Sequence, residues 1–120
     1  MDTHVLLWWL ADRRLTPNAR SVIADPYNAV FVSAATAWEI SIKSSLGKLR
    51  APDDLSAQVE SNGFSSLPIS LAHALVAGAL PRLHRDPIDR MLVAQSQLEE
   101  LTVVTRDFRI AAYGVQVVEA

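Results

Sequence analysis

The sequence predicts a single α/β domain with a central parallel sheet and crossover helices. Short β-rich apolar runs alternate with longer segments of helical periodicity, which is the order typical of this fold class. The chain of 120 residues is long enough for one hydrophobic core but too short for two. Hydrophobic residues make up 50% of it and charged residues 20%, which is typical of a globular domain spanning residues 1–120.

The elements in the first half of the chain follow from caps and breakers. Thr16 before Pro17 pairs an N-cap with a proline in the first helical turn. Gly47 is a C-cap for the helix before it, and Pro52 opens the next helix. The predicted elements are, in order, helices at residues 5–13 and 17–24, a strand at 29–33, and helices at 34–46 and 52–62.

The second half alternates in the same way. Pro81 stops an Ala- and Leu-rich helix, Asp86-Pro87 opens a long one, and Gly114 ends the last. A β-branched run separates the long helix from the last one. The predicted elements are, in order, a weak strand at residues 64–69, helices at 70–80 and 86–100, a strand at 101–105, a helix at 108–113 and a strand at 115–118.

The N-terminus departs from this pattern. A doubly wound sheet needs a buried strand before its first helix, yet only Met1 precedes Asp2. Either this first strand is truncated or residues upstream of Met1 are missing from the sequence. Both interpretations bear on stability and on how firmly Asp2 is anchored.

Composition excludes several classes of protein and of site. The chain has no cysteine, which excludes disulfides and Cys-ligated zinc or iron–sulfur sites and fits a reducing cytoplasm. No apolar run has the length of a membrane span, and the N-terminus lacks the pattern of a signal peptide. His4, His73 and His84 are too scattered to indicate a zinc site.

The net charge of −2 argues at first against a nucleic-acid partner. Thirteen acidic residues face eleven Lys and Arg. If four of the acids are set aside as metal ligands, nine remain, and the rest of the surface carries about +2. The charge is therefore compatible with a face that binds phosphate, although no strong basic stripe is present.

Four acidic residues lie where a strand should meet a helix, or on a helix face that otherwise has the pattern of a buried one. A small α/β fold can bring them to one edge of its sheet. Clustered carboxylates repel each other, so a fold that gathers four needs a cation, and oxygen ligands favour Mg²⁺ or Mn²⁺. Such an ion suits phosphodiester hydrolysis. The candidate catalytic and metal-binding residues are Asp2, Glu39, Asp89 and Asp107.

Helix capping is the alternative role for two of these acids. Asp2 precedes the first helix and Asp107 the last short one, and an Asp at either place can accept main-chain N–H groups. Asp107 also follows the carboxyl end of a predicted strand, as a site at a sheet edge requires. Ser33 and Thr105 end strands, and their hydroxyl groups can assist by orienting a carboxylate or a water.

The other two acids lie within helices. Glu39 borders or joins the apolar stripe of its helix, and an ion pair with Lys43 one turn later is its alternative role. We expect that stripe to consist of Ala35, Trp38, Ile42 and Leu46. Asp86 and Asp89 share a helix face. We assign Asp86 as the N-cap, with an assisting role, and Asp89 as a metal ligand.

Two further groups of residues are candidates for binding. Arg85, Arg90 and Arg106 can hold phosphates through their forked guanidinium groups, with surface ion pairing as the alternative. Trp8 and Trp9 are about 100° apart on a helix, so they cannot both point straight into one core. Either the more exposed one contacts a partner, or a wide apolar face buries both. The Ala-rich helix at residues 70–80 has little polar surface, which indicates an oligomer interface.

Five segments, taken together, resemble a PIN domain of the VapC toxin type. They are residues 2–8 (DTHVLLW), 32–40 (VSAATAWEI), 46–49 (LGKL), 84–95 (HRDPIDRMLVAQ) and 104–107 (VTRD). The resemblance implies a PIN-like three-layer α/β/α fold and a Mg²⁺- or Mn²⁺-dependent endoribonuclease whose acidic quartet is the one named above. It also implies a homodimer and a cognate VapB-type antitoxin that covers the cleft and contacts the helix of Trp8 and Trp9.

The leading hypothesis is a cytoplasmic ribonuclease, the toxin of a toxin–antitoxin pair, that hydrolyses RNA to 5′-phosphate and 3′-hydroxyl ends. No pair of histidines is placed to support attack by the 2′-hydroxyl group, which disfavours metal-free chemistry. One alternative is a Mg²⁺-dependent α/β phosphatase. That class carries an Asp-x-Asp motif after its first strand, whereas His4 stands two residues after Asp2 in this chain. The other is a catalytically inactive PIN-like binding module.

Overall fold

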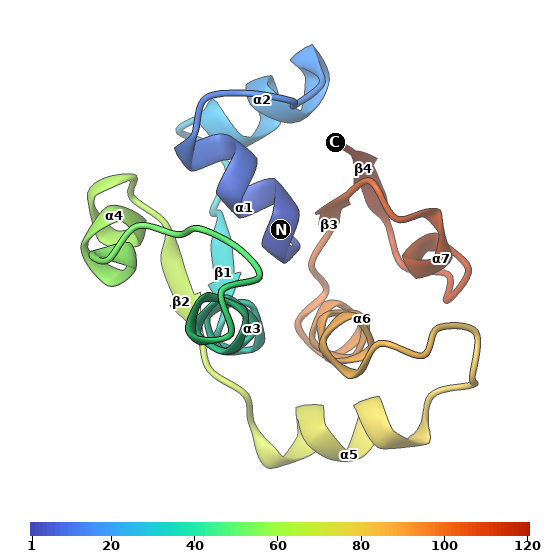
Figure 1. Cartoon of the computed structure of the whole chain (residues 1–120). Helices are drawn as coiled ribbons and strands as arrows, with labels where there is room; N and C mark the ends of the chain where they lie inside the picture. Colours follow the sequence, from blue (N-terminus) through green and yellow to red (C-terminus); the bar gives the residue numbers. More distant parts are fainter.

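The computed structural model describes residues 1–120, which fold into an α/β arrangement (Figure 1). The helices are α1 (Thr3–Leu10), α2 (Pro17–Ala24), α3 (Ala34–Ser45), α4 (Leu55–Ser61), α5 (Leu71–Ala79), α6 (Pro87–Glu99) and α7 (Phe108–Ala111). The strands are β1 (Phe31–Ser33), β2 (Ser65–Leu67), β3 (Val103–Thr105) and β4 (Val117–Glu119). Every predicted element is present, with ends that differ by a few residues. None of the helices has both the length and the apolarity that crossing a membrane requires.

The strands form two separate parallel pairs, whereas we predicted one central sheet. β1 pairs with β2, and β3 pairs with β4. The N-terminus lies between β1 and β3 (Figure 1), where the Met1 amino group is 3.5 Å from the Phe31 carbonyl oxygen and the Asp2 N–H donates to Val104 at 3.1 Å. The parallel direction of pairing is confirmed. The single sheet is wrong because two residues are too few to form a strand that joins the pairs.

An apolar cavity of about 300 Å³ lies between the two strand pairs. Most of its wall consists of apolar side chains from α2, β1, α6, β3 and β4, and Gln95 and Ser96 of α6 add polar groups. Met1 also lines this cavity, and burial lowers the pKa of its amino group. We refer to this space as the apolar cavity.

α1 begins at Thr3 and not at residue 5, because Asp2 is its N-cap. One carboxylate oxygen of Asp2 accepts the N–H of Val5 at 3.0 Å, which satisfies a main-chain donor in the first turn. The helix ends at Leu10, three residues before the predicted end at 13. The cause is the left-handed residue Asp12, whose φ is 54°.

Side-chain caps start five other helices, and those of α2 and α6 were predicted from the sequence. The capping residues are Thr16 for α2, Ser33 for α3, Ser70 for α5, Asp86 for α6 and Asp107 for α7. Gly47 follows α3 with a φ of 71°, which confirms it as the residue that ends this helix.

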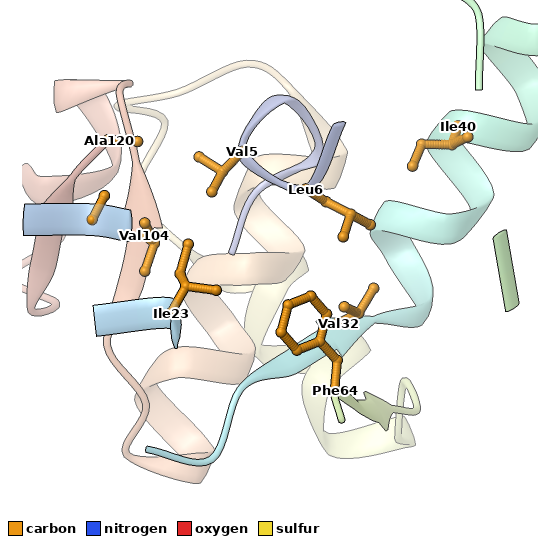
Figure 2. Close-up of a cluster of buried hydrophobic side chains, with 9 residues drawn as sticks. Val5, Leu6, Ile23, Val32, Ile40, Phe64, Val104 and Ala120 are labelled. Carbon is orange, nitrogen blue, oxygen red and sulfur yellow. The ribbon is translucent and has the colours of Figure 1, made fainter. Parts of the chain in front are cut away.

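The larger hydrophobic core surrounds α1, whose Val5 and Leu6 are completely buried (Figure 2). Its members come from α1, α2, β1, α3, β3 and segments beside them. They are Val5, Leu6, Ala19, Ile23, Val32, Ile40, Phe64, Val104 and Ala120. A smaller cluster of Val93, Val103 and Ile110 joins α6, β3 and α7. Packing on both sides of α1 therefore fixes the position of Asp2 at its start.

The apolar stripe that we predicted on α3 faces solvent, so this prediction is wrong except at Ala35. Trp38 is 63% exposed, Ile42 40% and Leu46 61%. The buried face consists of Ala35, Thr36 and Ile40. α3 packs against α1 and α6 through that face. The exposed row is thus an apolar surface of the isolated chain.

Trp8 and Trp9 are both partly buried, and each keeps part of its ring at the surface. The guanidinium of Arg106 lies 4.2 Å from the centre of the Trp8 ring. The indole N–H of Trp9 donates to Asn62 at 3.0 Å, and its ring is against Phe64. Both rings therefore have contacts within the chain, and the partner contact of the more exposed one stays a prediction.

Candidate active site

The four acids that the sequence singled out line one polar hollow of about 560 Å³. Asp2 caps α1, Glu39 belongs to α3, Asp89 to the first turn of α6, and Asp107 caps α7. Figure 1 shows the start of α1 between α3 and α6, at the centre of this arrangement. No hydrophobic side chain lines the hollow. We refer to this space as the polar hollow.

Asp2 and Asp107 each cap a helix with one oxygen and use the other oxygen for a contact with another side chain. In Asp2, Oδ1 accepts from the Val5 N–H, and Oδ2 accepts the Thr105 hydroxyl. In Asp107, Oδ1 accepts from the Arg109 N–H at 3.0 Å, while Oδ2 faces His84. The two roles that the sequence left open, cap and cluster member, are thus compatible for both residues.

The hydroxyl groups of Thr105 and Ser33 have different surroundings. Thr105 donates to Asp2 and accepts the main-chain N–H of Asp107 at 3.0 Å, so it links two of the acids. Ser33 accepts the N–H of Ala35 at 3.0 Å and lines the apolar cavity. The assisting position predicted for Thr105 is consistent with these contacts, whereas Ser33 has no contact with the polar hollow.

Glu39 lies in the hollow and pairs with Lys43 at 3.2 Å. Its side chain is 11% exposed and that of Lys43 37%. The ion pair predicted as its alternative role is therefore present. It does not remove Glu39 from the cluster, because Lys43 lines the same hollow.

The carboxyl groups of Asp89 and Asp107 have opposite pKa shifts. Burial, followed by the nearby charge of Asp86, raises the pKa of Asp89 from 3.8 to about 7, although His84 opposes the rise. Hydrogen bonds from the Arg109 side chain are the main cause that lowers the pKa of Asp107 to about 2. Asp86 caps α6 by accepting the Ile88 N–H at 2.8 Å. Arg109 therefore stabilises the charged form of Asp107, whereas no resident cation offsets the burial of Asp89 to the same extent.

The basic residues divide into those that support the fold and those that line the hollow. Arg90 donates to four main-chain carbonyl groups, and Arg106 donates to the carbonyls of Arg14 and Ala120. Those contacts give both side chains structural roles and leave their predicted phosphate binding without support. Arg85 is exposed and lines the hollow. Lys43 and Arg109 also line it.

His84 is the residue that the sequence reasoning missed. Its Nε2 is 2.9 Å from Oδ2 of Asp107 and 3.0 Å from Oδ2 of Asp89. We set the histidines aside because they are scattered along the chain. The signal that could have identified it is local: His84 stands two residues before Asp86, the predicted N-cap of the long helix, and therefore close to Asp89. His84 belongs to no metal-binding spacing motif.

The donor set fits a hard divalent cation. It offers carboxylate oxygens from four elements and no sulfur, which favours Mg²⁺ or Mn²⁺ over softer ions. Burial, followed by the nearby charge of Asp86, raises the pKa of Asp89, and a cation bound beside it would offset that rise. The Thr3 hydroxyl oxygen is buried beside the hollow without a hydrogen-bond partner. Ligand atoms of His84, Asp89 and Asp107 all lie within 4.8 Å of one another.

Comparison with known proteins connects this hollow with a family. The profile of the PIN domain matches residues 1–116. Over 58 residues the chain is 38% identical to Ribonuclease VapC16 of Mycobacterium tuberculosis. That match covers 45% of this chain and 41% of the relative, so it spans less than half of either protein. On the match over nearly its whole length, the chain belongs to the PIN domain family.

Proposed function

We propose that the protein is a Mg²⁺- or Mn²⁺-dependent endoribonuclease, the toxin component of a VapC-type toxin–antitoxin pair. The observation that carries this proposal is the meeting of four acids from distant elements in one polar hollow. Membership of the PIN domain family and the similarity to Ribonuclease VapC16 support the choice of RNA as substrate. A three-layer α/β/α arrangement, with the two strand pairs between layers of helices, is part of the proposal.

In this proposal Asp2, Glu39, Asp89 and Asp107 hold one or two divalent ions, directly or through water. A divalent ion bound there supplies charge neutralisation at the phosphate and lowers the pKa of a water. Thr105 and the α1 and α7 caps keep Asp2 and Asp107 in place. Glu39 either completes the ligand set or accepts the proton of the attacking water, since its one ion-pair partner is the side chain of Lys43, which is 37% exposed.

The products follow from the direction of hydrolysis. Attack of water in line with the leaving 3′-oxygen yields 5′-phosphate and 3′-hydroxyl ends. Arg85, Lys43 and Arg109 line the hollow and are the cations placed to contact the phosphates beside the cut bond. A single-stranded or looped RNA is the preferred substrate, because its backbone can reach an open polar hollow.

Exposed apolar rows support the proposed partners. Trp38, Ile42 and Leu46 form one row on α3, and Leu71 and Leu75 of α5 are 77% and 67% exposed. Apolar rows of this kind are typical of protein contacts. We assign them to the proposed homodimer and VapB-type antitoxin in preference to Trp8 and Trp9. The proposed location is the cytoplasm.

The experiment that tests the function is incubation of the purified protein with a pool of RNAs, in Mg²⁺ or in EDTA. We expect cleavage in Mg²⁺ only, with 5′-phosphate ends detectable by ligation. Asp89→Asn should lower the rate by more than about a hundredfold, because it removes a ligand charge without changing side-chain shape. Asp53→Asn is the matched control, since Asp53 is exposed and lies outside the hollow.

Cleavage that persists in EDTA, or an Asp89→Asn variant as active as the control, would contradict this function. An inactive binding module is the second candidate, favoured by the resident partners that already pair the acids. Mn²⁺ titration separates the two, because an inactive module should show neither cleavage nor a rise in melting temperature in excess Mn²⁺.

A further inference from the structure

His84 lies inside the acidic cluster as a buried side chain, 5% exposed. Its Nε2 hydrogen-bonds Oδ2 of Asp107 at 2.9 Å and lies 3.0 Å from Oδ2 of Asp89. These two carboxylates come from different elements, α6 and the start of α7. The imidazole is therefore the one resident side chain that contacts both.

The other ring nitrogen decides how His84 acts. The main-chain N–H of Asp86 points to Nδ1 at 3.1 Å. A main-chain N–H can only donate, so Nδ1 is the acceptor and the proton of the neutral ring is on Nε2. Nε2 is therefore a hydrogen-bond donor to the carboxylates, and in this arrangement it has no free lone pair to ligate a metal ion.

The segment that carries His84 is held on two sides. The Tyr113 hydroxyl accepts the main-chain N–H of His84 at 2.9 Å and donates to the Pro81 carbonyl at 2.7 Å. The guanidinium of Arg90 donates to carbonyl groups along residues 77–84, including that of His84. The ring is therefore fixed before any ion arrives, as a group that positions other groups must be.

We infer that His84 is a positioning residue for the divalent ion: its Nε2–H aligns the carboxylates of Asp89 and Asp107 toward one ion. This inference rests on the proposed function, because it assumes that the two carboxylates are ligands. At Asp89 a carboxylate oxygen can accept the imidazole hydrogen bond with one lone pair and bind an ion with another. At Asp107 the exposed guanidinium of Arg109 also donates to Oδ2 at 3.0 Å, and an ion bound there takes the place of that contact. Without the donor, the two carboxylates repel each other and the ion has to order them as it binds.

Two substitutions of His84 distinguish the role of Nδ1 from that of Nε2. His84→Asn keeps an acceptor near Nδ1 for the Asp86 N–H but removes the donor at Nε2. His84→Gln keeps a donor near Nε2. His73→Asn is the matched control, because His73 is also buried and also accepts a main-chain N–H through Nδ1, but it pairs with Glu99 outside the hollow.

The test is Mn²⁺ binding followed by electron paramagnetic resonance, with melting temperatures in EDTA as the check on folding. We expect His84→Asn to weaken Mn²⁺ binding by about 10–100-fold, which is the usual effect of removing a hydrogen bond to a ligand. His84→Gln should recover part of that loss, and His73→Asn should bind like the natural protein. Equal Mn²⁺ affinity for His84→Asn and the control would overturn the inference.

A measurement on the unchanged protein gives an independent answer. Pulsed electron paramagnetic resonance of the Mn²⁺ complex should lack the nitrogen coupling of a directly bound imidazole. Such a coupling, if lost in His84→Gln, would make His84 a ligand and overturn the positioning role. Failure of the proposed function is distinguishable, because then the natural protein would bind Mn²⁺ no better than Asp89→Asn.

Discussion

The apolar cavity and the polar hollow are lined by successive residues at the start of the chain. Met1 lines the first and Asp2 the second. Most residues that line the apolar cavity are hydrophobic, whereas no hydrophobic residue lines the polar hollow. Burial favours the first kind of wall and penalises the second, since buried carboxylates repel. The comparison teaches that stability and chemistry are assigned to two sides of the molecule, an apolar side of cavity and core and a polar side around the hollow.

The largest expected effect is on the apolar side. Leu6→Ala should lower the free energy of unfolding by about 2–5 kcal/mol, because Leu6 is completely buried in the larger core. Urea unfolding monitored by circular dichroism measures the loss. The comparison predicts that the folded fraction keeps its Mn²⁺ affinity, and a fall in that affinity would show that the two sides are coupled.

The next effect is a dependence on pH on the polar side. Below about pH 7 the metal-free protein holds a proton on Asp89, and an ion has to displace it. Mn²⁺ affinity should therefore rise by about 25-fold between roughly pH 5.5 and 7.5. Calorimetric titration in buffers of different ionisation heat measures the proton released. In Asp89→Asn the residual binding should be independent of pH over this range.

The same shift predicts the sign of a stability change without metal. The folded pKa of Asp89 is raised above 3.8, so the folded state binds more protons than the unfolded state between about pH 4 and 7. Stability from this group should fall as pH rises through that window, and saturating Mg²⁺ should remove the fall. The lowered pKa of Asp107 acts separately, because its contribution is lost only as pH falls from about 4 toward 2.

Asp2 contributes to stability as the cap of α1 and to the proposed chemistry as a residue of the polar hollow. Removal of the cap should lower the free energy of unfolding by about 1 kcal/mol. Asp2→Asn keeps an oxygen to cap α1, while Asp2→Ala removes it. We expect Asp2→Ala to be less stable than Asp2→Asn by that amount, although both lose metal-dependent cleavage. Thermal unfolding in EDTA compares them. Equal stability would mean that the cap contributes nothing and that core packing alone places Asp2.

The smallest effect is a gain from filling the apolar cavity. Val104 lines it and is 8% exposed. Val104→Ile adds one methylene and should stabilise the protein by no more than about 0.8 kcal/mol. Cleavage should be unchanged, so a clear gain in melting temperature at constant activity would sharpen the separation. A loss of stability would indicate that the cavity is already filled by local rearrangement.

Local patterns in the sequence were enough to predict most elements. Thr16 and Asp86 start helices because a short polar side chain before a proline satisfies free N–H groups wherever it occurs. The meeting of four acids was predictable for a related reason, because strand ends and helix starts lie at one edge of a parallel fold. Such predictions need no knowledge of which elements are neighbours.

The wrong predictions concern residues whose burial or contacts depend on elements that are distant in the sequence. Periodicity found the apolar row of Trp38, Ile42 and Leu46 but could not tell that α3 packs through the adjacent face. His84 acquires its role from Asp107, which lies 23 residues away and comes near it only through tertiary packing. Arg90 had the right charge for phosphate, yet four main-chain carbonyl groups close to it in space accept hydrogen bonds from its guanidinium.

The contacts of Arg90 have a mechanical consequence. Its side chain ties the end of α5 and the following loop to α6, the helix that also carries Asp89. Loop and helix therefore move as one block, and amide hydrogens there should exchange slowly with solvent. Any widening that admits a long polymer therefore has to come from the opposite wall, where α1 and α3 meet.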